Sequence, residues 1–174
     1  FHQGQVCMAI NRIIACKEIY TEFIQELVNV VKKLKVGDPS DPETFIGPMI
    51  NSQQADKFEK LVSDTIAAGA TVALEGRREG NLVYPWILAD CTNDMPAAKQ
   101  EIFGPAVCII KAADEDEAVC IANDTEYGLS GSVFTRDLYH GLKVARKVHT
   151  GMVHVNDQSI NDEPHVMFGG EKHS

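Results

Sequence analysis

Residues 11–31 have the sequence NRIIACKEIYTEFIQELVNVV, in which a short run with β-branched residues leads directly into a longer amphipathic segment. Residues 11–16 are therefore predicted to form a strand, and residues 18–31 a helix. The apolar positions of the second segment recur at helical spacing: Ile19, Phe23, Leu27 and Val31. A strand followed at once by an amphipathic helix is the first half of a crossover between parallel strands, so this stretch indicates an α/β fold.

The same alternation of predicted strands and helices continues to residue 155. Further strands are expected at residues 71–75, 83–88, 106–111, 130–134 and 152–155, and further helices at residues 52–68, 115–123 and 138–148. Asn51 is expected to cap the first of these helices. Residues 38–48, with three prolines, are expected to form a loop. Pro85 is expected to push its strand toward an edge after a turn at residues 76–81. The order predicts a mostly parallel open sheet with helices on both faces.

Length and composition limit what the chain can be. Its 174 residues suit one domain spanning residues 1–174, and 44% apolar with 24% charged residues is typical of an ordinary globular protein. No apolar run is long enough to span a bilayer. A formal net charge of -9 repels the phosphate backbone of nucleic acids. No membrane and no nucleic acid are therefore expected as partners.

Five cysteines, an odd number with no CxxC pair, favour reduced thiols in the cytoplasm over a disulfide framework. His149 and His154 span a predicted helix-to-strand junction with a spacing that is unusual for metal ligands, so no metal site is expected. The chain opens on Phe1 rather than Met, and its first motif starts at once. We therefore expect the chain to be part of a longer protein.

Three short motifs stand out. Residues 1–7, FHQGQVC, place Cys7 directly after a Gly-Gln turn; residues 101–105 are EIFGP; and residues 167–172 are MFGGEK. A single cysteine is most often a small buried hydrophobe. The three motifs together favour a reactive Cys7. The remaining cysteines are expected to be core or edge thiols: Cys16, Cys91, Cys108 and Cys120.

With these motifs, the chain resembles the catalytic domain of the NAD(P)-dependent aldehyde dehydrogenases, in particular members that act on benzaldehyde- and vanillin-like compounds. The resemblance covers essentially all 174 residues. The most specific matches are residues 4–7, 101–105 and 168–170, and the supporting matches are residues 47–48, 123–129 and 151–156. The resemblance implies the fold of that domain, oxidation of an aldehyde to a carboxylic acid, and NAD or NADP as the cofactor.

By this resemblance Cys7 is the catalytic nucleophile, which attacks the aldehyde carbon to give a thiohemiacetal and, after loss of hydride, a thioester. A thiolate suits both steps, because it adds to a carbonyl and is later displaced by water. The backbone N–H of Cys7 is expected to donate to the oxyanion, and Gly4 to let the backbone approach closely. Since an ordinary thiol is only a few per cent ionised at neutral pH, the site also needs a base or a local positive potential.

The resemblance assigns the cofactor to four side chains. Glu101 would accept hydrogen bonds from the hydroxyls of the nicotinamide ribose. Phe103, on the same side of an extended segment, would pack on the nicotinamide ring. Gln54 and Lys57, one turn apart on a predicted helix, would reach the adenosine ribose. Simpler roles stay open for all four: a solvated loop carboxylate, a core aromatic and two surface residues without a ligand.

Met167 and Phe168 are expected to line the substrate pocket with an apolar, adaptable wall. Met167 departs from the family pattern, in which many relatives carry proline, and residues 161–166 resemble an insertion in the loop that would meet the substrate. Asn156 is expected to form a turn. The small-molecule substrate is expected to be an aromatic or other bulky hydrophobic aldehyde.

Several parts of the family's machinery are not found in the sequence: the Gly-rich phosphate-binding segment, the glutamate base, the asparagine donor and the last strand, through which relatives oligomerise. We expect the dinucleotide-binding domain and that strand to belong to a longer parent, a homo-oligomeric dimer or tetramer. The 174-residue chain alone is then expected to be inactive. Two alternatives remain: a CoA-acylating semialdehyde dehydrogenase, and a non-catalytic binding or structural protein on the same scaffold.

Overall fold

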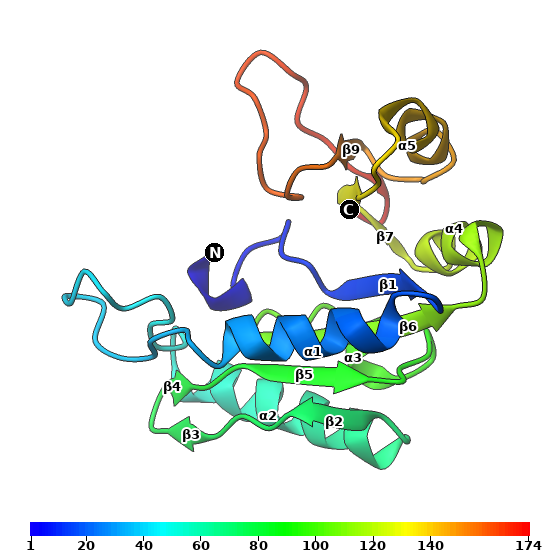
Figure 1. Cartoon of the computed structure of the whole chain (residues 1–174). Helices are drawn as coiled ribbons and strands as arrows, with labels where there is room; N and C mark the ends of the chain where they lie inside the picture. The colour runs from blue at the N-terminus through cyan, green and yellow to red at the C-terminus, as the bar shows by residue number, and fades with distance from the viewer.

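The computed structural model describes residues 1–174 and is built around a four-stranded sheet (Figure 1). The strands lie in the order β1-β6-β5-β2, with β1 at Arg12–Cys16, β6 at Ala106–Ala112, β5 at Trp86–Ala89 and β2 at Thr71–Leu74. β6 is parallel to both of its neighbours, and β2 runs antiparallel to β5. The predicted mostly parallel open sheet is confirmed.

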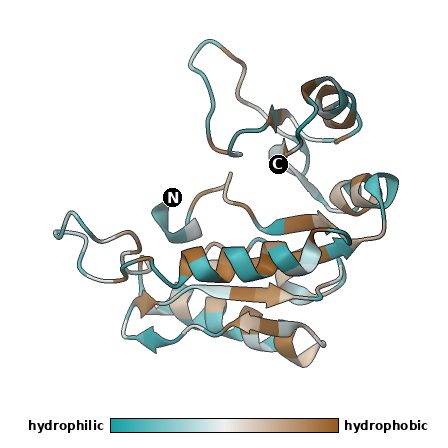
Figure 2. Cartoon of the chain, viewed as in Figure 1, coloured by the Kyte–Doolittle hydropathy of each residue, from teal (hydrophilic) through white to brown (hydrophobic).

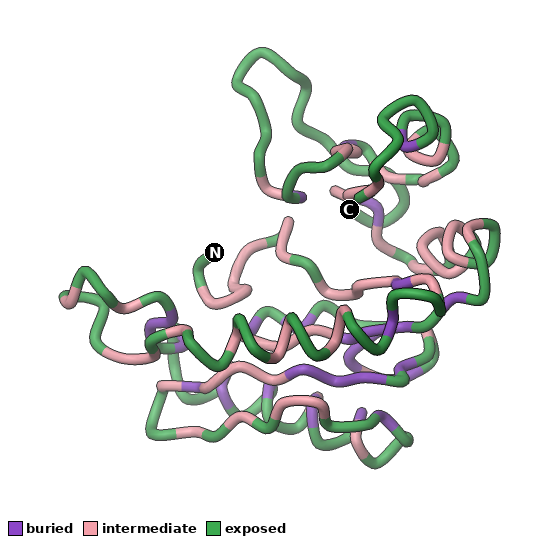
Figure 3. Tube along the Cα trace, in the orientation of Figure 1, coloured by how far each residue is buried: buried purple, intermediate pink, exposed green.

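The two central strands bury both of their faces. β6 is an almost continuous apolar run, AVCIIKA, as a parallel strand covered on both sides requires. Ile109 packs with Ile87 on one face of the sheet, while Cys108 packs with Leu88 on the other. Figure 3 shows that the buried residues are concentrated in β5 and β6.

Helices cover both faces of the sheet, as predicted. One face is covered by α1 (Tyr20–Val31), and the other by α2 (Ser52–Ala67), α3 (Pro96–Lys99) and α4 (Glu115–Asn123). The helix residues in these contacts include Tyr20, Phe23 and Leu27 of α1, Phe58 and Val62 of α2, Ala97 of α3 and Ile121 of α4. In Figure 2 hydrophobic and hydrophilic residues alternate along α1, as expected for an amphipathic helix. None of the helices combines the length and apolar character needed to cross a membrane.

A second, smaller sheet lies beside the first. β8 (Ser130–Val133) and β9 (Met152–Val155) pair in parallel and are connected by α5 (Leu138–Ala145). β7 (Tyr127–Gly128) pairs antiparallel with β10 (Glu171–Lys172), so the C-terminal segment returns to this part of the molecule. Figure 1 shows these elements above the main sheet, with α4 between the two parts.

The structure differs from the prediction mainly between residues 71 and 89. The single strand expected at residues 83–88 is wrong, because Pro85 has no N–H to donate and separates β4 (Leu82–Val83) from β5. β4 pairs in a hairpin with β3 (Arg78–Glu79), a strand inside the expected turn. Other short elements were also not predicted, because two to four residues show no periodicity: the 3-10 helix η1 at His2–Gly4, α3, β7 and β10.

Candidate active site

Cys7 lies in an irregular segment that is held against the loop before α2. Gly4 ends η1 with a φ of +75°. The Gln5 side chain bridges to the loop: its Oε1 accepts from the N–H of Ile50 at 2.9 Å, and its Nε2 donates to the carbonyl of Pro48 at 3.5 Å. The Cys7 thiol is exposed, and the Cys7 N–H donates to no backbone carbonyl. Both groups are therefore open to a ligand.

Gly4 packs directly on Gly104, in the loop before β6, and leaves no room for a β-carbon between them. Gly104 in turn packs on α2, where a β-carbon on Gly104 would lie 2.2 Å from Cδ2 of Phe58. The Cys7 segment, the loop of residues 101–105 and α2 are therefore stacked on one another. This stacking brings together two of the three sequence motifs and the helix that carries Gln54 and Lys57.

The loop of residues 101–105 turns one side chain inward and two outward. Ile102 is buried in the core, whereas Glu101 is exposed and Phe103 is 40% exposed. The Glu101 carboxylate forms no hydrogen bond within the chain, so it is free to accept from a ligand. Phe103 has a φ of +44°, a left-handed conformation that costs a non-glycine residue about 1–3 kcal/mol. The expectation of an extended segment at Phe103 is therefore wrong, although both outward side chains remain accessible.

α2 places Gln54 and Lys57 on neighbouring turns at its N-terminal end. Gln54 is half-buried, and Lys57 is exposed beside Phe58, whose ring supports the stacked glycines. The adjacent Asp56 pairs with Arg78 at 2.6 Å, and the Lys57 ammonium makes no ion pair. Both predicted side chains thus lie on the helix that packs against the loop of residues 101–105.

Met167 and Phe168 lie on the long loop between β9 and β10, which rises away from the main sheet in Figure 1. Met167 is 90% exposed and Phe168 is 55% exposed. An apolar groove of about 440 Å³ lies on α2 and β5 and is lined in part by Val62, Ile66 and Trp86. Neither Met167 nor Phe168 lines this groove. The structure therefore places these two residues at the surface, on a loop that begins close to the Cys7 segment.

Ser159 ties the start of this loop to the Cys7 segment, and sequence reasoning missed it. Its side chain is almost completely buried, and its Oγ donates to the carbonyl of Met8 at 2.8 Å. Its own carbonyl accepts from Oγ of Ser130 in β8 at 2.6 Å. The residue directly after Cys7 is thereby bonded to the loop that carries Met167. A lone serine in an irregular segment gives no sequence signal for such a role.

A model of the aldehyde dehydrogenase family matches residues 1–174. The chain belongs to the aldehyde dehydrogenase family. It is 50% identical to a benzaldehyde dehydrogenase of Bacillus subtilis and 44% identical to a vanillin dehydrogenase of Corynebacterium glutamicum, each over 173 residues. Both alignments cover 99% of this chain and 36% of the relative, so the chain spans little more than a third of the length of the relatives it matches.

Solved aldehyde dehydrogenase structures match the fold closely. A salicylaldehyde dehydrogenase from Pseudomonas putida G7, complexed with salicylaldehyde, is 36% identical with a TM-score of 0.93, covering 98% of this chain and 35% of that one. A glyceraldehyde-3-phosphate dehydrogenase from Methanocaldococcus jannaschii, complexed with NADP, is 38% identical with a TM-score of 0.93, covering 98% and 37%. An aldehyde dehydrogenase from Mycobacterium tuberculosis, complexed with NAD+, is 38% identical with a TM-score of 0.92, covering 98% and 36%. The predicted aldehyde dehydrogenase fold is confirmed.

The other cysteines of this aldehyde dehydrogenase chain differ in exposure. Cys91 and Cys108 are buried in the core, as predicted, and the hydrogen bond with Cys91 together with burial raises the pKa of the Cys108 thiol. Cys16 is half-buried, and burial raises its pKa. Cys120 is exposed, as is Cys7. Exposure alone therefore does not single out Cys7; its neighbourhood does.

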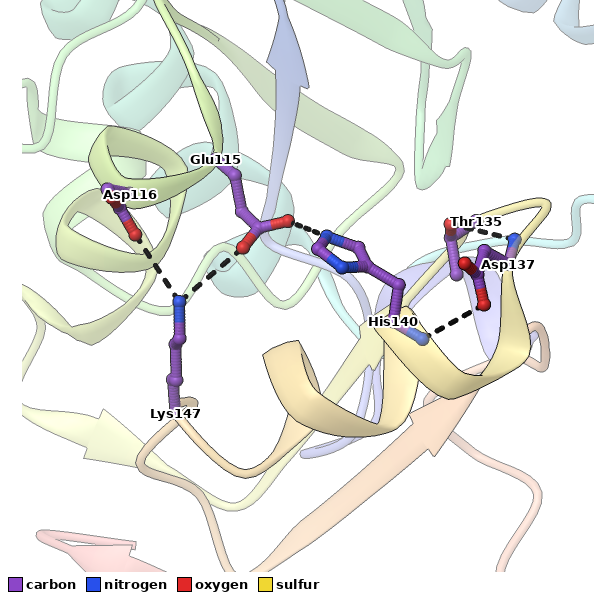
Figure 4. Close-up of polar contacts among 6 residues, drawn as sticks. All are labelled: Glu115, Asp116, Thr135, Asp137, His140 and Lys147. Carbon is purple, nitrogen blue, oxygen red and sulfur yellow. Dashed lines mark hydrogen bonds and ion pairs between the residues drawn. The ribbon is translucent and has the colours of Figure 1, made fainter.

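Charged side chains hold the two parts of the aldehyde dehydrogenase chain together (Figure 4). Nζ of Lys147 lies 3.4 Å from Oε1 of Glu115 and 3.3 Å from Oδ1 of Asp116, and Nε2 of His140 contacts the second Glu115 oxygen. The hydrogen bond with His140 lowers the pKa of Glu115, and the hydrogen bond with Asp116 raises the pKa of Lys147. These contacts fasten α5, and with it the β8–β9 sheet, to α4 on the main sheet.

Proposed function

We propose that this chain is the catalytic part of an NAD(P)-dependent aldehyde dehydrogenase in which Cys7 is the nucleophile. The observation that carries the proposal is the stacking of the Cys7 segment on the loop of residues 101–105 through Gly4 and Gly104. A nucleophile on one segment and a cofactor held by the other can then meet at one small substrate. Membership of the aldehyde dehydrogenase family supports this assignment.

In this proposal Cys7 acts in two steps. Its thiolate adds to the carbonyl carbon and forms a C–S bond, while the Cys7 N–H, which has no other backbone partner, donates to the oxyanion. Loss of hydride from that carbon leaves a thioester on Cys7. Water then adds to the thioester carbon and displaces the sulfur, which regains its thiol and releases the carboxylic acid. The base that activates the thiol and a second oxyanion donor belong to the rest of the parent protein.

The side chains on and beside the loop of residues 101–105 fit a nicotinamide dinucleotide. The exposed, unpartnered Glu101 carboxylate can accept from two ribose hydroxyls, and the partly exposed Phe103 ring offers an apolar face to the nicotinamide. We assign Gln54 and Lys57 to the adenosine ribose. The cofactor, when bound, accepts the hydride. Complexes of similar structures with NADP and with NAD+ support either dinucleotide.

The chain spans 36% of its benzaldehyde dehydrogenase relative, and we assign residues 1–174 to a single catalytic domain of a longer parent. The dinucleotide-binding domain and an oligomerisation strand lie in the remainder, and the parent is a homo-oligomer, a dimer or tetramer. All five cysteines are free, which suits the cytoplasm. Without a segment that cradles the pyrophosphate at a helix N-terminus, the isolated chain has no dehydrogenase activity.

The proposed substrate is an aromatic aldehyde. The benzaldehyde and vanillin dehydrogenase relatives support it, as does the similar structure with bound salicylaldehyde. Met167 and Phe168 can supply an apolar wall once the loop that carries them is covered. A 3-sulfolactaldehyde dehydrogenase of Priestia megaterium, 40% identical over 171 residues, shows that a small acidic aldehyde is the alternative to test.

The decisive experiment uses the full-length parent with benzaldehyde and NAD+ or NADP. NADH or NADPH formation is expected with the wild type and not with Cys7→Ser, while Glu101→Gln is expected to weaken cofactor binding. Product analysis with and without CoA separates hydrolysis from acyl transfer to a thiol. Turnover by Cys7→Ser would refute the nucleophile. A specificity constant for acetaldehyde or 3-sulfolactaldehyde about tenfold above that for benzaldehyde would refute the substrate class.

A further inference from the structure

Asn11 makes three side-chain hydrogen bonds to one short segment. Its Nδ2 donates to the carbonyls of Ala97 and Gln100, each at 2.9 Å, and its Oδ1 accepts from the N–H of Ile102 at 3.0 Å. A single side chain therefore fastens the end of α3 and the loop that follows it. No sequence motif pointed to this residue.

The bonded groups lie on both sides of Glu101. The carbonyl of Gln100 precedes it and the N–H of Ile102 follows it, so the Glu101 backbone cannot rotate without breaking one of these bonds. Asn11 is itself fixed, because its carbonyl accepts from the N–H of Cys108 in β6 at 3.1 Å. The main sheet thus sets the position of the Glu101 backbone through one amide group.

Backbone hydrogen bonds hold the loop around Glu101 only through its carbonyls, those of Gly104 and Pro105. Within residues 101–105 no backbone N–H donates to a backbone carbonyl, and the N–H of Ile102 donates to Asn11 instead. Phe103 keeps its left-handed conformation, with a φ of +44°, and such strain persists only where the surroundings fix the backbone. Asn11 supplies part of that constraint.

We propose that Asn11 is a positioning residue that sets Glu101 and Phe103, and through them the cofactor, relative to Cys7. The inference rests on the proposed function, because it takes the Glu101 loop as a cofactor site. A side-chain amide suits the position, since it presents two donors and an acceptor in one plane. A hydroxyl at residue 11 would donate once, and a carboxylate would donate nothing.

The test measures cofactor binding in the full-length parent. Asn11→Ala is expected to raise the Kd and the KM for NAD+ about tenfold with a smaller change in kcat, because the loosened loop must be ordered when the cofactor binds. Asn11→Asp, which keeps the shape, is expected to weaken binding at least as much, since its carboxylate would face two carbonyl oxygens. Hydrogen exchange at the Ile102 amide reports the loosening directly.

Asn93→Ala is the matched control. Nδ2 of Asn93 donates to the carbonyl of Ile121 at 3.0 Å and to the carboxylate of Asp124 at 2.9 Å, and its Oδ1 accepts from Arg12 at 2.6 Å. Asn93 therefore ties α4 to β1 and makes no hydrogen bond to the Glu101 loop. A loss of melting temperature similar to that of Asn11→Ala is expected, with unchanged NAD+ affinity and unchanged exchange at Ile102.

Weaker NAD+ binding and faster Ile102 exchange in Asn11→Ala alone support the inference. Unchanged NAD+ binding in Asn11→Ala, or equal weakening in Asn93→Ala, overturns it while leaving the proposed function intact. A wild-type parent that binds neither NAD+ nor NADP refutes the proposed function and the inference together.

Discussion

A β-carbon on Gly4 would lie 2.3 Å from the carbonyl oxygen of Gly104, closer than side-chain carbons approach a backbone oxygen in real proteins. The contact joins two segments that are 100 residues apart in the sequence. Since Gly104 is pressed on the other side against the ring of Phe58, neither segment can retreat without disturbing α2. The close approach of the Cys7 segment to the Glu101 loop therefore depends on glycine at both positions.

Gly4→Ala is therefore expected to be far more damaging than Gly80→Ala. Both glycines have a left-handed φ, +75° and +64°, so alanine costs about 1–2 kcal/mol of backbone strain at either position. Only at Gly4 does the new β-carbon also meet backbone; at Gly80 nothing lies within 4 Å. Urea unfolding of both variants measures the loss of unfolding free energy and separates backbone strain, common to both, from the steric clash found only at Gly4. Equal losses in the free energy of unfolding would show that the Gly4–Gly104 contact is not restrictive.

Strong local signals decided which elements could be predicted. α4 begins and ends as expected, because Asp114 caps it by accepting from the N–H of Glu117 at 2.9 Å and three acids occupy its first turn. The β3–β4 hairpin was missed because each of its strands has two residues, too few for a pattern of alternation. The continuous apolar run of β6, by contrast, predicted a buried strand.

The residues of the candidate site also fall into those that the sequence identified and those that it did not. Cys7, Glu101 and Phe103 were identified by motifs, whereas Asn11 and Ser159 were not. Ser159 bonds to a carbonyl 151 residues away, and Asn11 bonds to an N–H 91 residues away. Hydrogen bonds between distant segments leave no periodicity in the sequence, so only the folded chain reveals them.

The turn predicted at Asn156 can be tested by substitution. Asn156 has a φ of +59°, and its Oδ1 accepts from the N–H of Thr135 at 2.8 Å, which joins the ends of β9 and β8. Asn156→Ala is expected to lose about 2 kcal/mol of stability, because it adds backbone strain to a lost hydrogen bond. Asn156→Gly loses only the bond and should lie between alanine and the wild type in chemical denaturation. Alanine equal to glycine would mean that strain plays no part.

The Glu115 contacts predict a pH dependence. Contact with His140 and Lys147 holds the pKa of Glu115 below its ordinary value of 4.5. A carboxyl with a lowered folded-state pKa stabilises the fold above its unfolded pKa, and this contribution is lost as the pH falls through the folded-state pKa. Glu115→Gln should therefore lower the melting temperature near neutral pH and have no effect in strong acid.

Melting curves from neutral to acid pH at low and high salt check this expectation. The effect should be modest and should shrink with salt, because the side chains involved are solvent-exposed. Glu26→Gln, an exposed glutamate of α1 without an ion pair, is the matched control. A Glu115→Gln effect that persists in strong acid, or that Glu26→Gln reproduces, would contradict the role of the ion pairs.

Thiol labelling tests the surroundings of Cys7. Iodoacetamide is expected to modify the exposed Cys7 and Cys120 first. Cys16 should follow more slowly, because burial raises its pKa and lowers its thiolate fraction. Cys91 and Cys108 should react only after unfolding, because both are buried. Peptide mass mapping after brief labelling measures the order.

Protection by the cofactor distinguishes the two exposed thiols. In the full-length parent, NAD+ held by the Glu101 loop would lie beside Cys7, whereas Cys120 belongs to α4, which follows the opposite end of β6. NAD+ at saturating concentration is therefore expected to slow the alkylation of Cys7 and leave that of Cys120 unchanged. A Cys120→Ser variant leaves Cys7 as the single fast thiol and allows its rate constant to be followed directly. Equal protection of both thiols, or of neither, would place the cofactor away from the Gly4–Gly104 contact and remove the basis for Cys7 as the nucleophile.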